Sequence, residues 1–409
     1  MKRLTIIFAL VLAATSMMAD QFKIGKLTFK VGRYSSNTVL IKADKNISEA
    51  HLSETITYKG ETYTLTSIGN RAFRNCKSLT SITIPSSVTE IGWEAFEGCK
   101  SLTSITIPSS VTEIGFDAFY ECTALYNDSA NWENGALYIN DCLIEVNKNV
   151  SGEYTIKENT RLINNYAFSG CKRLTAITIP NSVTKIGYAA FAWCTSLKSV
   201  TIPNSVTDIG FRAFDRCLSL TSVTIPNSVT KIEHFAFHGC KSLTSITIPN
   251  SVTEIEDYAF RHCESLTSVT IPSSVKKIGY RTFENAALYN NPSNWENGVL
   301  YIGDCLIQVD KNFVGNCNIK ENTRLIADRA FADCASLTSV TITSRVNEIG
   351  WWTFQGCKSL TSVTIPSSVK EIGHEAFKGC KSLKEVTIPK SVKNISTNAF
   401  PKHTKIIRK

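Results

Sequence analysis

Residues 79–99 read LTSITIPSSVTEIGWEAFEGC, and residues 102–122 read LTSITIPSSVTEIGFDAFYEC. The second stretch begins 23 residues after the first, and the same pattern returns along most of the chain. Eleven cysteines mark the period, because they follow one another in steps of 23 within three groups: Cys76, Cys99 and Cys122; Cys171, Cys194, Cys217, Cys240 and Cys263; Cys334, Cys357 and Cys380. Self-similarity at a fixed period of this length indicates a solenoid in which each repeat is one coil.

One repeat predicts a coil with three sides. Ile82 and Ile84 alternate with polar residues, as in a strand with one buried face. Pro85 ends the strand, because it cannot donate a hydrogen bond, and Gly92 is expected to relieve crowding at the next bend. The remaining apolar positions of the repeat should fill the interior: Val88, Ile91, Ala95, Phe96 and Cys99. A single coil cannot bury these side chains alone, so stacked neighbours must complete the core.

The repeat resembles a known family. Its Leu-x-x-Ile-x-Ile start is similar to leucine-rich repeats, and the continuation Pro-x-Ser-Val-Thr-x-Ile-Gly-x-x-Ala-Phe-x-x-Cys resembles the BspA-like leucine-rich repeat surface proteins of bacteria. The resemblance covers about residues 65–400. It implies a β-rich solenoid, a leucine-rich-repeat superhelix, and a role in adhesion to extracellular-matrix proteins. The Asn or Cys that usually follows the strand in such repeats is replaced by Ser87 and its equivalents, so the corner geometry should differ from that of ordinary leucine-rich repeats.

Two similar segments, 124–167 and 287–330, interrupt the array. Each contains Asn-Trp-Glu-Asn-Gly, then Leu-Tyr-Ile and Cys-Leu-Ile around a two-residue turn. The turns Asn140-Asp141 and Gly303-Asp304 predict tight β-hairpins. We interpret both segments as longer, irregular coils within one solenoid that spans residues 65–400.

The ends differ from the array. Residues 1–19 have the charged start, apolar stretch and small final residue of a signal peptide, which predicts export. No other apolar run is long enough to span a membrane. Residues 20–64 alternate apolar and polar side chains and contain the turn Lys59-Gly60, which predicts a small β cap over the first coil. In the C-terminal end, 401–409, Thr404 to Ile407 predict a shortened final strand.

The fourteen cysteines bear on the redox state of the protein. In an exported protein they would ordinarily suggest disulfides. The eleven that mark the period occupy one inward position, where pairing would strain a uniform stack, so we expect buried free thiols. Cys142, Cys305 and Cys317 lie outside this column. Cys305 and Cys317 flank a hairpin and are the best candidates for a disulfide.

The formal charge of the chain is +9, and its densest basic run lies near the C-terminus: Lys378, Lys381, Lys384, Lys390, Lys393, Lys402, Lys405, Arg408 and Lys409. Such a run suits an acidic partner such as a glycan, an anionic lipid or a nucleic acid, but a solvated basic end is the simpler interpretation. We expect a protein or glycan partner and no nucleic acid.

The sequence contains no familiar catalytic motif. It lacks Gly-x-Ser-x-Gly, Gly-x-x-x-x-Gly-Lys and His-Glu-x-x-His, so it predicts no enzyme, no cofactor and no metal. The one cluster of histidines is His234, His238 and His262. With Asp257 one coil from His234, these residues define a hypothetical surface metal site, and exposed histidines at variable positions are the simpler interpretation.

The segment after Ile-Gly varies most between repeats. Its first residue, which we call the variable position, or the residue after it carries an aromatic side chain in many repeats. The candidate partner-binding residues form a group that we call the aromatic edge: Trp93, Phe116, Tyr188, Phe211, Phe235, Tyr258, Tyr280, Trp351 and Trp352. Charged residues such as Arg212 and Arg281 lie among them, which is the composition of binding hot spots. The alternative is that these rings pack on one another and cover the bend. The exposed strand face, in contrast, is a uniform Ser/Thr ladder.

Three functions remain open. The first is an adhesion or protein-binding module, secreted or at the cell surface. The second is a structural component of the envelope that associates with itself. The third is a metal-dependent enzyme, which would require His234, His238 and His262 to gather around one ion. Oligomeric state does not follow from the sequence.

Overall fold

The computed structural model describes residues 20–32 and 36–409, so the predicted signal peptide lies outside the described residues. Contacts divide the chain into two compact units. Unit 1 contains the described residues up to Val146 together with Arg161–Ala167, and unit 2 contains Asn147–Thr160 and Phe168–Lys409. The division runs through the first irregular segment. A single continuous solenoid across residues 124–167 therefore stays a prediction.

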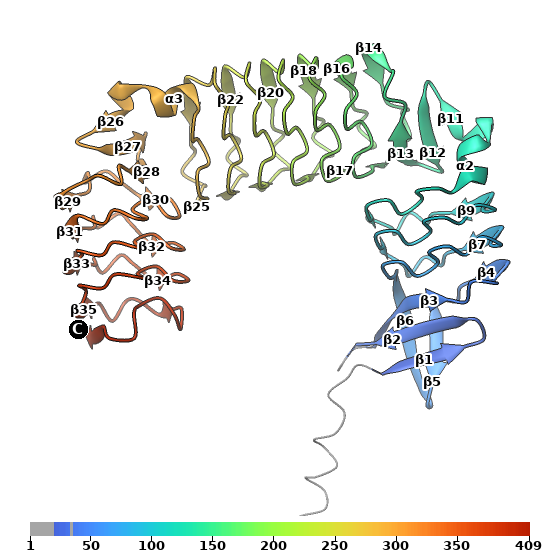
Figure 1. The fold of residues 1–409 in the computed structure, drawn as a ribbon, viewed down its shortest axis with the longest axis horizontal. Coiled ribbons are helices and arrows are strands. Elements are labelled where there is room, and N and C mark those ends of the chain that lie inside the picture. The colour runs from blue at the N-terminus through green and yellow to red at the C-terminus, as the bar shows by residue number, and fades with distance from the viewer. Residues whose placement is uncertain (1–19, 33–35) are drawn as a thin grey trace, which may run out of the picture. The chain divides into compact units, whose positions relative to one another are not determined.

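Each repeat forms one coil of a β-solenoid, with two short strands joined by turns (Figure 1). The first strand of the coils is β7 (Ser81–Thr83) and β9 (Ser104–Thr106) in unit 1, and in unit 2 it is β14 (Ser151–Thr155), β16 (Arg173–Thr178), β18 (Ser199–Thr201), β20 (Ser222–Thr224), β22 (Ser245–Thr247), β24 (Ser268–Thr270), β29 (Gly315–Asn318), β31 (Leu337–Thr341), β33 (Ser362–Thr364), β35 (Glu385–Ile388) and β37 (Lys405–Arg408).

The second strand of the coils has two residues. It is β8 (Glu90–Ile91), β10 (Glu113–Ile114) and β15 (Leu162–Ile163) in unit 1, and β17 (Lys185–Ile186), β19 (Asp208–Ile209), β21 (Lys231–Ile232), β23 (Glu254–Ile255), β25 (Lys277–Ile278), β30 (Leu325–Ile326), β32 (Glu348–Ile349), β34 (Glu371–Ile372) and β36 (Asn394–Ile395) in unit 2.

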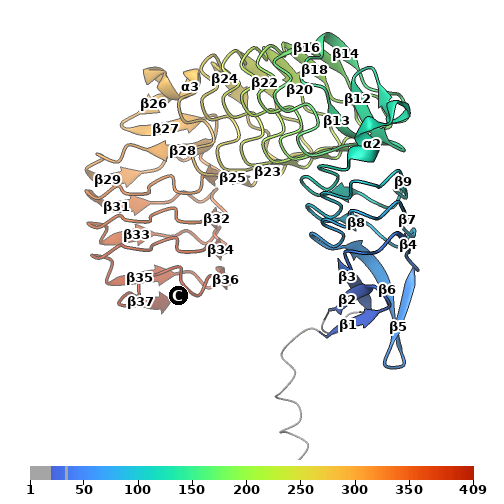
Figure 2. The ribbon, with the colours of Figure 1, turned by 45° about the vertical axis from the view of Figure 1, so that its right-hand side comes forward.

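Neighbouring coils pair in parallel, and the register follows the 23-residue period. In unit 2, Thr178 pairs with Thr201 and Thr201 pairs with Thr224. Figure 2 shows β16 to β24 as one row of parallel strands. The predicted Ser/Thr ladder therefore exists on the exposed strand face. The expected final strand is also present, because β37 pairs with β35.

The interior is filled by two columns from the third side of each coil. Phenylalanine rings stack on their equivalents, with centroids 4.7–5.6 Å apart, along Phe73 to Phe119 in unit 1 and, in unit 2, along Phe168 to Phe283 and Phe331 to Phe400. Beside them, the Cys99 thiol donates to the Phe73 carbonyl of the previous coil at 3.1 Å, and Cys217 does the same to Phe191 at 3.2 Å. Burial of this column, as predicted, is confirmed.

The glycine after the second strand allows the coils to approach closely. A Cβ on Gly115 would lie 2.3 Å from the Trp93 backbone nitrogen, and one on Gly210 would lie 2.8 Å from the Gly187 carbonyl carbon. Both distances are shorter than any tolerable contact. The prediction that this glycine relieves crowding is therefore confirmed.

The N-terminal segment is β-structured, as predicted. It consists of β1 (Gln21–Ile24), β2 (Leu27–Val31), β3 (Asn37–Ala43), β4 (Glu49–His51), β5 (Thr55–Tyr58) and β6 (Glu61–Ile68). Lys59-Gly60 forms the expected two-residue turn, because Tyr58 pairs with Glu61. The segment also extends the sheets of the solenoid, because β4 pairs in parallel with β7 and β6 pairs in parallel with β8.

The two irregular segments share one architecture. The first contains α2 (Thr123–Asn127), the 3₁₀ turn η1 (Ser129–Asn131), β11 (Trp132–Glu133), β12 (Ala136–Ile139) and β13 (Cys142–Val146); the second contains α3 (Ala287–Asn290), η2 (Pro292–Asn294), β26 (Trp295–Glu296), β27 (Val299–Ile302) and β28 (Cys305–Val309). Both predicted hairpins are confirmed, because Ile139 pairs with Cys142 and Ile302 pairs with Cys305.

An arginine fixes each hairpin to the coil before it. In unit 2, Arg324 pairs with Asp304 of the hairpin turn at 3.0 Å and donates to the Val275 carbonyl at 2.6 Å. In unit 1, Arg161 pairs with Asp141 at 3.0 Å and donates to the Val111 carbonyl. The same device therefore holds both insertions in register with the coils. In the described part of the chain, no helix is long and apolar enough to cross a membrane.

The burial of the cysteines yields a chemical prediction. All fourteen are buried and unpaired, Cys305 and Cys317 included. Burial raises the pKa of Cys122 to about 12 and that of Cys317 to about 11. At pH 8 the thiolate of Cys317 should then be about a hundredfold scarcer than that of an ordinary thiol. We expect a thiol-titrating disulfide reagent at pH 8 to modify none of the fourteen in the folded protein and all of them after denaturation.

The reduced, denatured protein serves as the control, since it must give fourteen thiols. If a denatured but unreduced sample gives two thiols fewer than the reduced control, two cysteines form a disulfide, and the free state of the cysteines is contradicted. Rapid modification of the folded protein would contradict their burial.

Candidate binding surface

The aromatic edge follows from an unusual backbone position. The residue one place after the variable position has a φ of 49–61° in every coil of the described chain except the last, where Asn398 stands at this position. We call these residues the left-handed column: Arg71, Glu94, Asp117, Tyr166, Ala189, Arg212, Phe235, Tyr258, Arg281, Arg329, Trp352 and Glu375. The left-handed region favours glycine and costs other residues roughly 1–2 kcal/mol. The column nevertheless contains no glycine.

Hydrogen bonds between coils hold the left-handed column in place. The N–H of Ala189 donates to the Phe211 carbonyl at 2.8 Å, and the N–H of Tyr258 donates to the Tyr280 carbonyl at 3.0 Å. Each bond therefore ties the left-handed residue of one coil to the variable residue of the next. Variable and left-handed residues alternate along the edge, and their side chains come close together.

In unit 1 the aromatic edge is short. Trp93 is 47% exposed and lies beneath the Arg71 guanidinium, with 5.1 Å from the guanidinium carbon to the ring centre. Phe116 is 46% exposed and meets Tyr166 edge to face at 5.0 Å.

In unit 2 the predicted residues form one continuous run. Tyr188 stacks on Phe211 at 5.2 Å, Phe211 contacts Phe235 at 5.6 Å, and Phe235 stacks on Tyr258 at 4.6 Å. Tyr258 then meets Tyr280 edge to face at 5.7 Å. The rings do pack on one another, as the alternative interpretation required. Most of them are nevertheless only half-buried, so their faces and edges remain available.

Arginines complete this run. Arg212 covers both Phe211 and Phe235, at 5.5 and 4.8 Å. Arg329 lies between Tyr280 and Trp352, at 4.8 and 4.5 Å, and so joins the tyrosine run to Trp351 and Trp352 across the second irregular segment. In the described part of the chain no carboxylate pairs with Arg329. The ring faces are the partners that the structure shows for its guanidinium group.

Sequence reasoning missed two exposed aromatic side chains, Trp193 and Tyr120, the latter 53% exposed. Trp193 is 44% exposed and lies 4.4 Å from the Arg216 guanidinium carbon. It occupies a second left-handed position, where Gly170 and Gly239 stand in other coils. The signal in the sequence was a tryptophan at a position that other repeats give to glycine.

Carboxyl and amide side chains at the variable position accept hydrogen bonds from the backbone of the next coil. Asp328 occupies a variable position, and its Oδ1 accepts the Trp351 N–H at 2.8 Å. Asp257 binds the Tyr280 N–H in the same way at 2.7 Å, and Asn70 binds the Trp93 N–H at 3.0 Å. Asp328 is only 8% exposed, and burial raises its pKa to about 7. It is therefore a structural acceptor whose negative charge is poorly solvated.

Asp328 also lines a cleft of about 520 Å³ between β25 and β30, beside the second hairpin. Lys277 and Lys370 face Glu348 and Glu371 around it. Charges of both signs line this cleft, so it selects neither cations nor anions by electrostatics alone.

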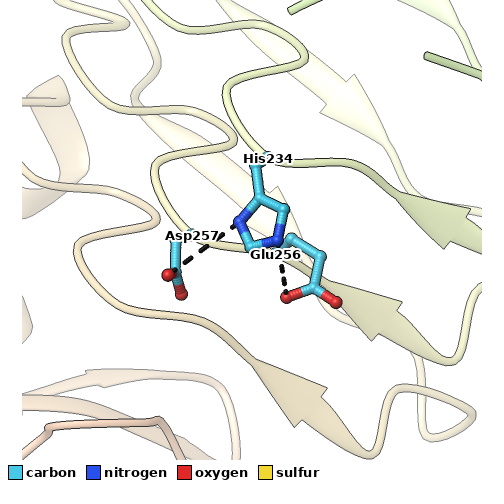
Figure 3. Close-up of side chains that lie close together, drawn as sticks. All are labelled: His234, Glu256 and Asp257. Atoms are coloured by element: carbon cyan, nitrogen blue, oxygen red, sulfur yellow. Dashed lines mark ion pairs between the residues drawn. The ribbon is translucent and has the colours of Figure 1, made fainter. Parts of the chain in front are cut away.

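A second charged group lies at β23 and the bend after β21. His234 lies between two carboxylates, with Nε2 3.7 Å from Glu256 and Nδ1 3.9 Å from Asp257 (Figure 3). The carboxylates therefore face opposite nitrogens of the imidazole. Glu256 is buried and also binds the ammonium groups of Lys231 at 3.0 Å and Lys277 at 3.1 Å.

The charge interactions of Glu256 decide whether this group of side chains can bind a metal ion. Burial alone would raise the pKa of Glu256, but its hydrogen bonds and charge interactions with the two lysines outweigh burial and lower it. His234, Glu256 and Asp257 each offer one ligand atom within 4.8 Å of the others, but a metal ion at Glu256 would have to compete with both ammonium groups. The arrangement is best described as an ion-pair hub that joins three coils.

The three histidines of the hypothetical metal site have separate partners. His238 Nδ1 lies 2.8 Å from Asp215 Oδ1, and His262 lies beside Asn285. The rings of His238 and His262 meet edge to face at 5.6 Å. His234 belongs to the hub instead. The structure therefore does not bring the three imidazoles together as metal ligands.

The repeat is shared with a family of known proteins. The model of the BspA type leucine rich repeat region, which spans six copies, matches residues 48–171, 161–290 and 297–408. These matches cover most of the chain. The chain belongs to the BspA type leucine-rich repeat family. The resemblance that the sequence indicated is therefore confirmed, and so is the leucine-rich-repeat solenoid.

Several solved structures are similar to this BspA type chain. A leucine-rich repeat protein from Bacteroides ovatus is 27% identical over 95% of this chain and 90% of that chain, with a TM-score of 0.35. A leucine rich cell surface protein from Faecalibacterium prausnitzii is 27% identical over 96% of both chains, with a TM-score of 0.31. The pneumococcal vaccine antigen PcpA is 18% identical over 96% and 86%, with a TM-score of 0.26. The TM-scores are low, so the family assignment rests on the repeat match. The comparison with curated proteins found no match.

The left-handed column of this BspA type chain predicts a stabilising substitution. Ala189 has a φ of 49° and no side chain that reaches a partner. Ala189→Gly should raise the free energy of unfolding by about 1 kcal/mol, because glycine adopts this conformation without strain. Chemical denaturation monitored by circular dichroism measures the change. The control is Ala190→Gly at the next, ordinary position, which should lower stability by about 1 kcal/mol. Equal effects of the two substitutions would contradict strain at Ala189.

Asp328 gives a prediction about pH. An acid whose folded pKa is raised binds more protons when folded, so its contribution to stability falls as pH rises from about 4 through about 7. Asp328→Asn keeps the acceptor for Trp351 and removes the charge. The variant should gain roughly 2–4 kcal/mol of stability at pH 8 and nothing at pH 4. Asp257→Asn, at the same position with a side chain 35% exposed, should gain much less. A gain for Asp328→Asn that does not depend on pH would contradict the argument.

Proposed function

We propose that this chain is exported and binds an extracellular or cell-surface protein through the aromatic edge of unit 2. The observation that carries the proposal is the continuous run of rings and guanidinium groups from Tyr188 to Trp352. Export rests on the signal peptide predicted at residues 1–19.

The composition of the run supports partner binding. Tyrosine, tryptophan and arginine are the residues that dominate binding energy at protein interfaces. Here the arginines are already held over the rings, as Arg212 is over Phe235 at 4.8 Å. Fewer side-chain rotamers must then be fixed when a partner binds, so the entropic cost of association is lower.

The strand face presents much less chemical variety to a partner than the aromatic edge does. Its outward positions repeat serine and threonine, as in Ser199 and Thr201, and in-register pairing of these residues stabilises the sheet. A surface with this little variety has few means of discriminating between partners. The edge, in contrast, presents different side chains in nearly every coil.

Membership of a repeat family supports a binding role over catalysis. The candidate for a metal centre is the ion-pair hub of His234, Glu256 and Asp257, and its central carboxylate is already neutralised by two lysines. A long array of coils also allows several weak contacts to act together, which raises the overall affinity.

The test measures binding of the purified chain to immobilised extracellular-matrix proteins and glycans. The edge variant carries Tyr280→Ser, Arg329→Gln and Trp351→Ser, which remove the junction where Arg329 joins the two parts of the run. We expect saturable binding to at least one protein and a loss of affinity of at least about thirtyfold in the variant.

The matched control carries Thr201→Ala, Thr224→Ala and Thr247→Ala on the strand face. It changes three exposed side chains of the same unit and should bind like the unchanged chain.

A further variant, Trp93→Ser with Phe116→Ser, tests unit 1 separately. Circular dichroism must show that all variants are folded. Equal losses in the edge and strand-face variants would contradict the edge as the site. Absence of binding together with concentration-dependent self-association would favour the structural alternative.

A further inference from the structure

The positive charge of the chain is concentrated in one place. Residues 376–409, which we call the basic end, contain nine lysines and arginines and a single acidic residue, Glu385. The formal charge of these residues is therefore +8, whereas the whole chain carries +9. The other coils are close to neutral.

The fold gathers these cations from separate parts of the sequence. The Lys405 N–H donates to the Lys384 carbonyl at 2.8 Å, and the Lys390 N–H donates to the Lys409 carbonyl at 2.7 Å. Lys384, Lys390, Lys405 and Lys409 thus lie on adjacent backbone beside β35 and β37, and all four are exposed. They form two pairs, Lys384 with Lys405 and Lys390 with Lys409, at opposite ends of these two strands, although up to 25 residues separate them in the sequence.

The group is electrostatically unsatisfied. Within the basic end, Lys378 pairs with Glu375 at 2.7 Å, and Arg408 donates to the Val392 carbonyl at 2.7 Å. In the described part of the chain, the ammonium groups of Lys384, Lys390, Lys405 and Lys409 have no carboxylate partner. Like charges on neighbouring coils repel one another, and a polyanion would relieve the repulsion.

We propose that the basic end binds a linear anionic polysaccharide, one that carries carboxylate or sulfate groups. Most of the cations are lysines on flexible stems, which act as point charges and do not require the planar geometry that arginine prefers. A linear polymer with many anionic groups can reach cations distributed around a coil. This site is separate from the aromatic edge, so the inference goes beyond the proposed function and does not depend on it.

The side chains around the lysines argue against two other anionic partners. Single-stranded nucleic acids require exposed rings for base stacking, but Phe377 is fully buried and Phe400 stacks on it at 4.7 Å. Peripheral membrane binding requires apolar side chains that insert. Ile406, 44% exposed, is the one large apolar side chain of the basic end that is exposed.

Charge also disfavours contact between copies of the chain. Two basic ends repel each other. Residues 20–64, in unit 1, contain seven basic and five acidic residues and so carry no compensating negative charge. A foreign polyanion is therefore a better partner for the basic end than a second copy.

The experiment measures binding of the purified chain to immobilised heparin and to polygalacturonate at several salt concentrations. Single-stranded DNA and vesicles of phosphatidylglycerol and phosphatidylcholine are the comparison ligands. The basic-end variant carries Lys384→Gln, Lys390→Gln, Lys405→Gln and Lys409→Gln. The control carries Lys148→Gln, Lys172→Gln, Lys198→Gln and Lys276→Gln, which remove the same charge from exposed positions elsewhere in unit 2.

We expect both polysaccharides to bind and their binding to weaken with salt. The basic-end variant should lose roughly a hundredfold in affinity, and the control should lose less than about threefold. The edge variant should bind polysaccharide normally, so failure of one proposal is distinguishable from failure of the other. Equal losses in the basic-end and control variants would overturn the site. Tighter binding to DNA or vesicles than to both polysaccharides would overturn the partner.

Discussion

Every coil of this protein depends on the hydrogen bonds and side-chain contacts that it makes with the coils on either side. A strand of two or three residues is too short to be stable alone, and one coil has too few apolar side chains to enclose an interior. Parallel pairing at a fixed offset solves both problems, because it aligns every buried side chain with its own equivalent. Phe96, for instance, is covered by Phe73 on one side and Phe119 on the other.

The same dependence positions the aromatic edge. The backbone N–H of most left-handed residues donates to a carbonyl of the next coil, so the distance between coils also sets the distance between rings. Stacking of Phe235 on Tyr258 at 4.6 Å follows from this spacing. The ring contacts are therefore a consequence of the fold, and the identity of the side chains determines what they present to a partner.

The sequence predicted the repeated parts of the structure well, because periodicity reports directly on burial. The cysteine and phenylalanine columns, the close approach at Gly115 and the hairpin turn at Asn140-Asp141 could all be inferred from residue type and spacing. The aromatic residues of the candidate site could be identified in the same way, since they occupy two adjacent positions of the repeat that vary.

Other features depend on contacts that a single repeat does not reveal. The left-handed column escaped notice because it lacks glycine, the residue that usually marks such a conformation. The place of Arg329 between Tyr280 and Trp352 required knowing that these residues meet across an insertion of irregular length. The burial of Asp328 and the double neutralisation of Glu256 likewise arise from neighbouring coils.

The left-handed column also separates the shape of the scaffold from the chemistry on its surface. Its twelve positions hold alanine, acids, arginines and large rings on the same backbone conformation. Since the backbone strain is similar whichever non-glycine residue is present, one side chain can replace another without altering the path of the chain. A lineage of such proteins could therefore acquire new ligands by point mutation alone, and a protein engineer could randomise these twelve positions as a ready-made library of binding surfaces.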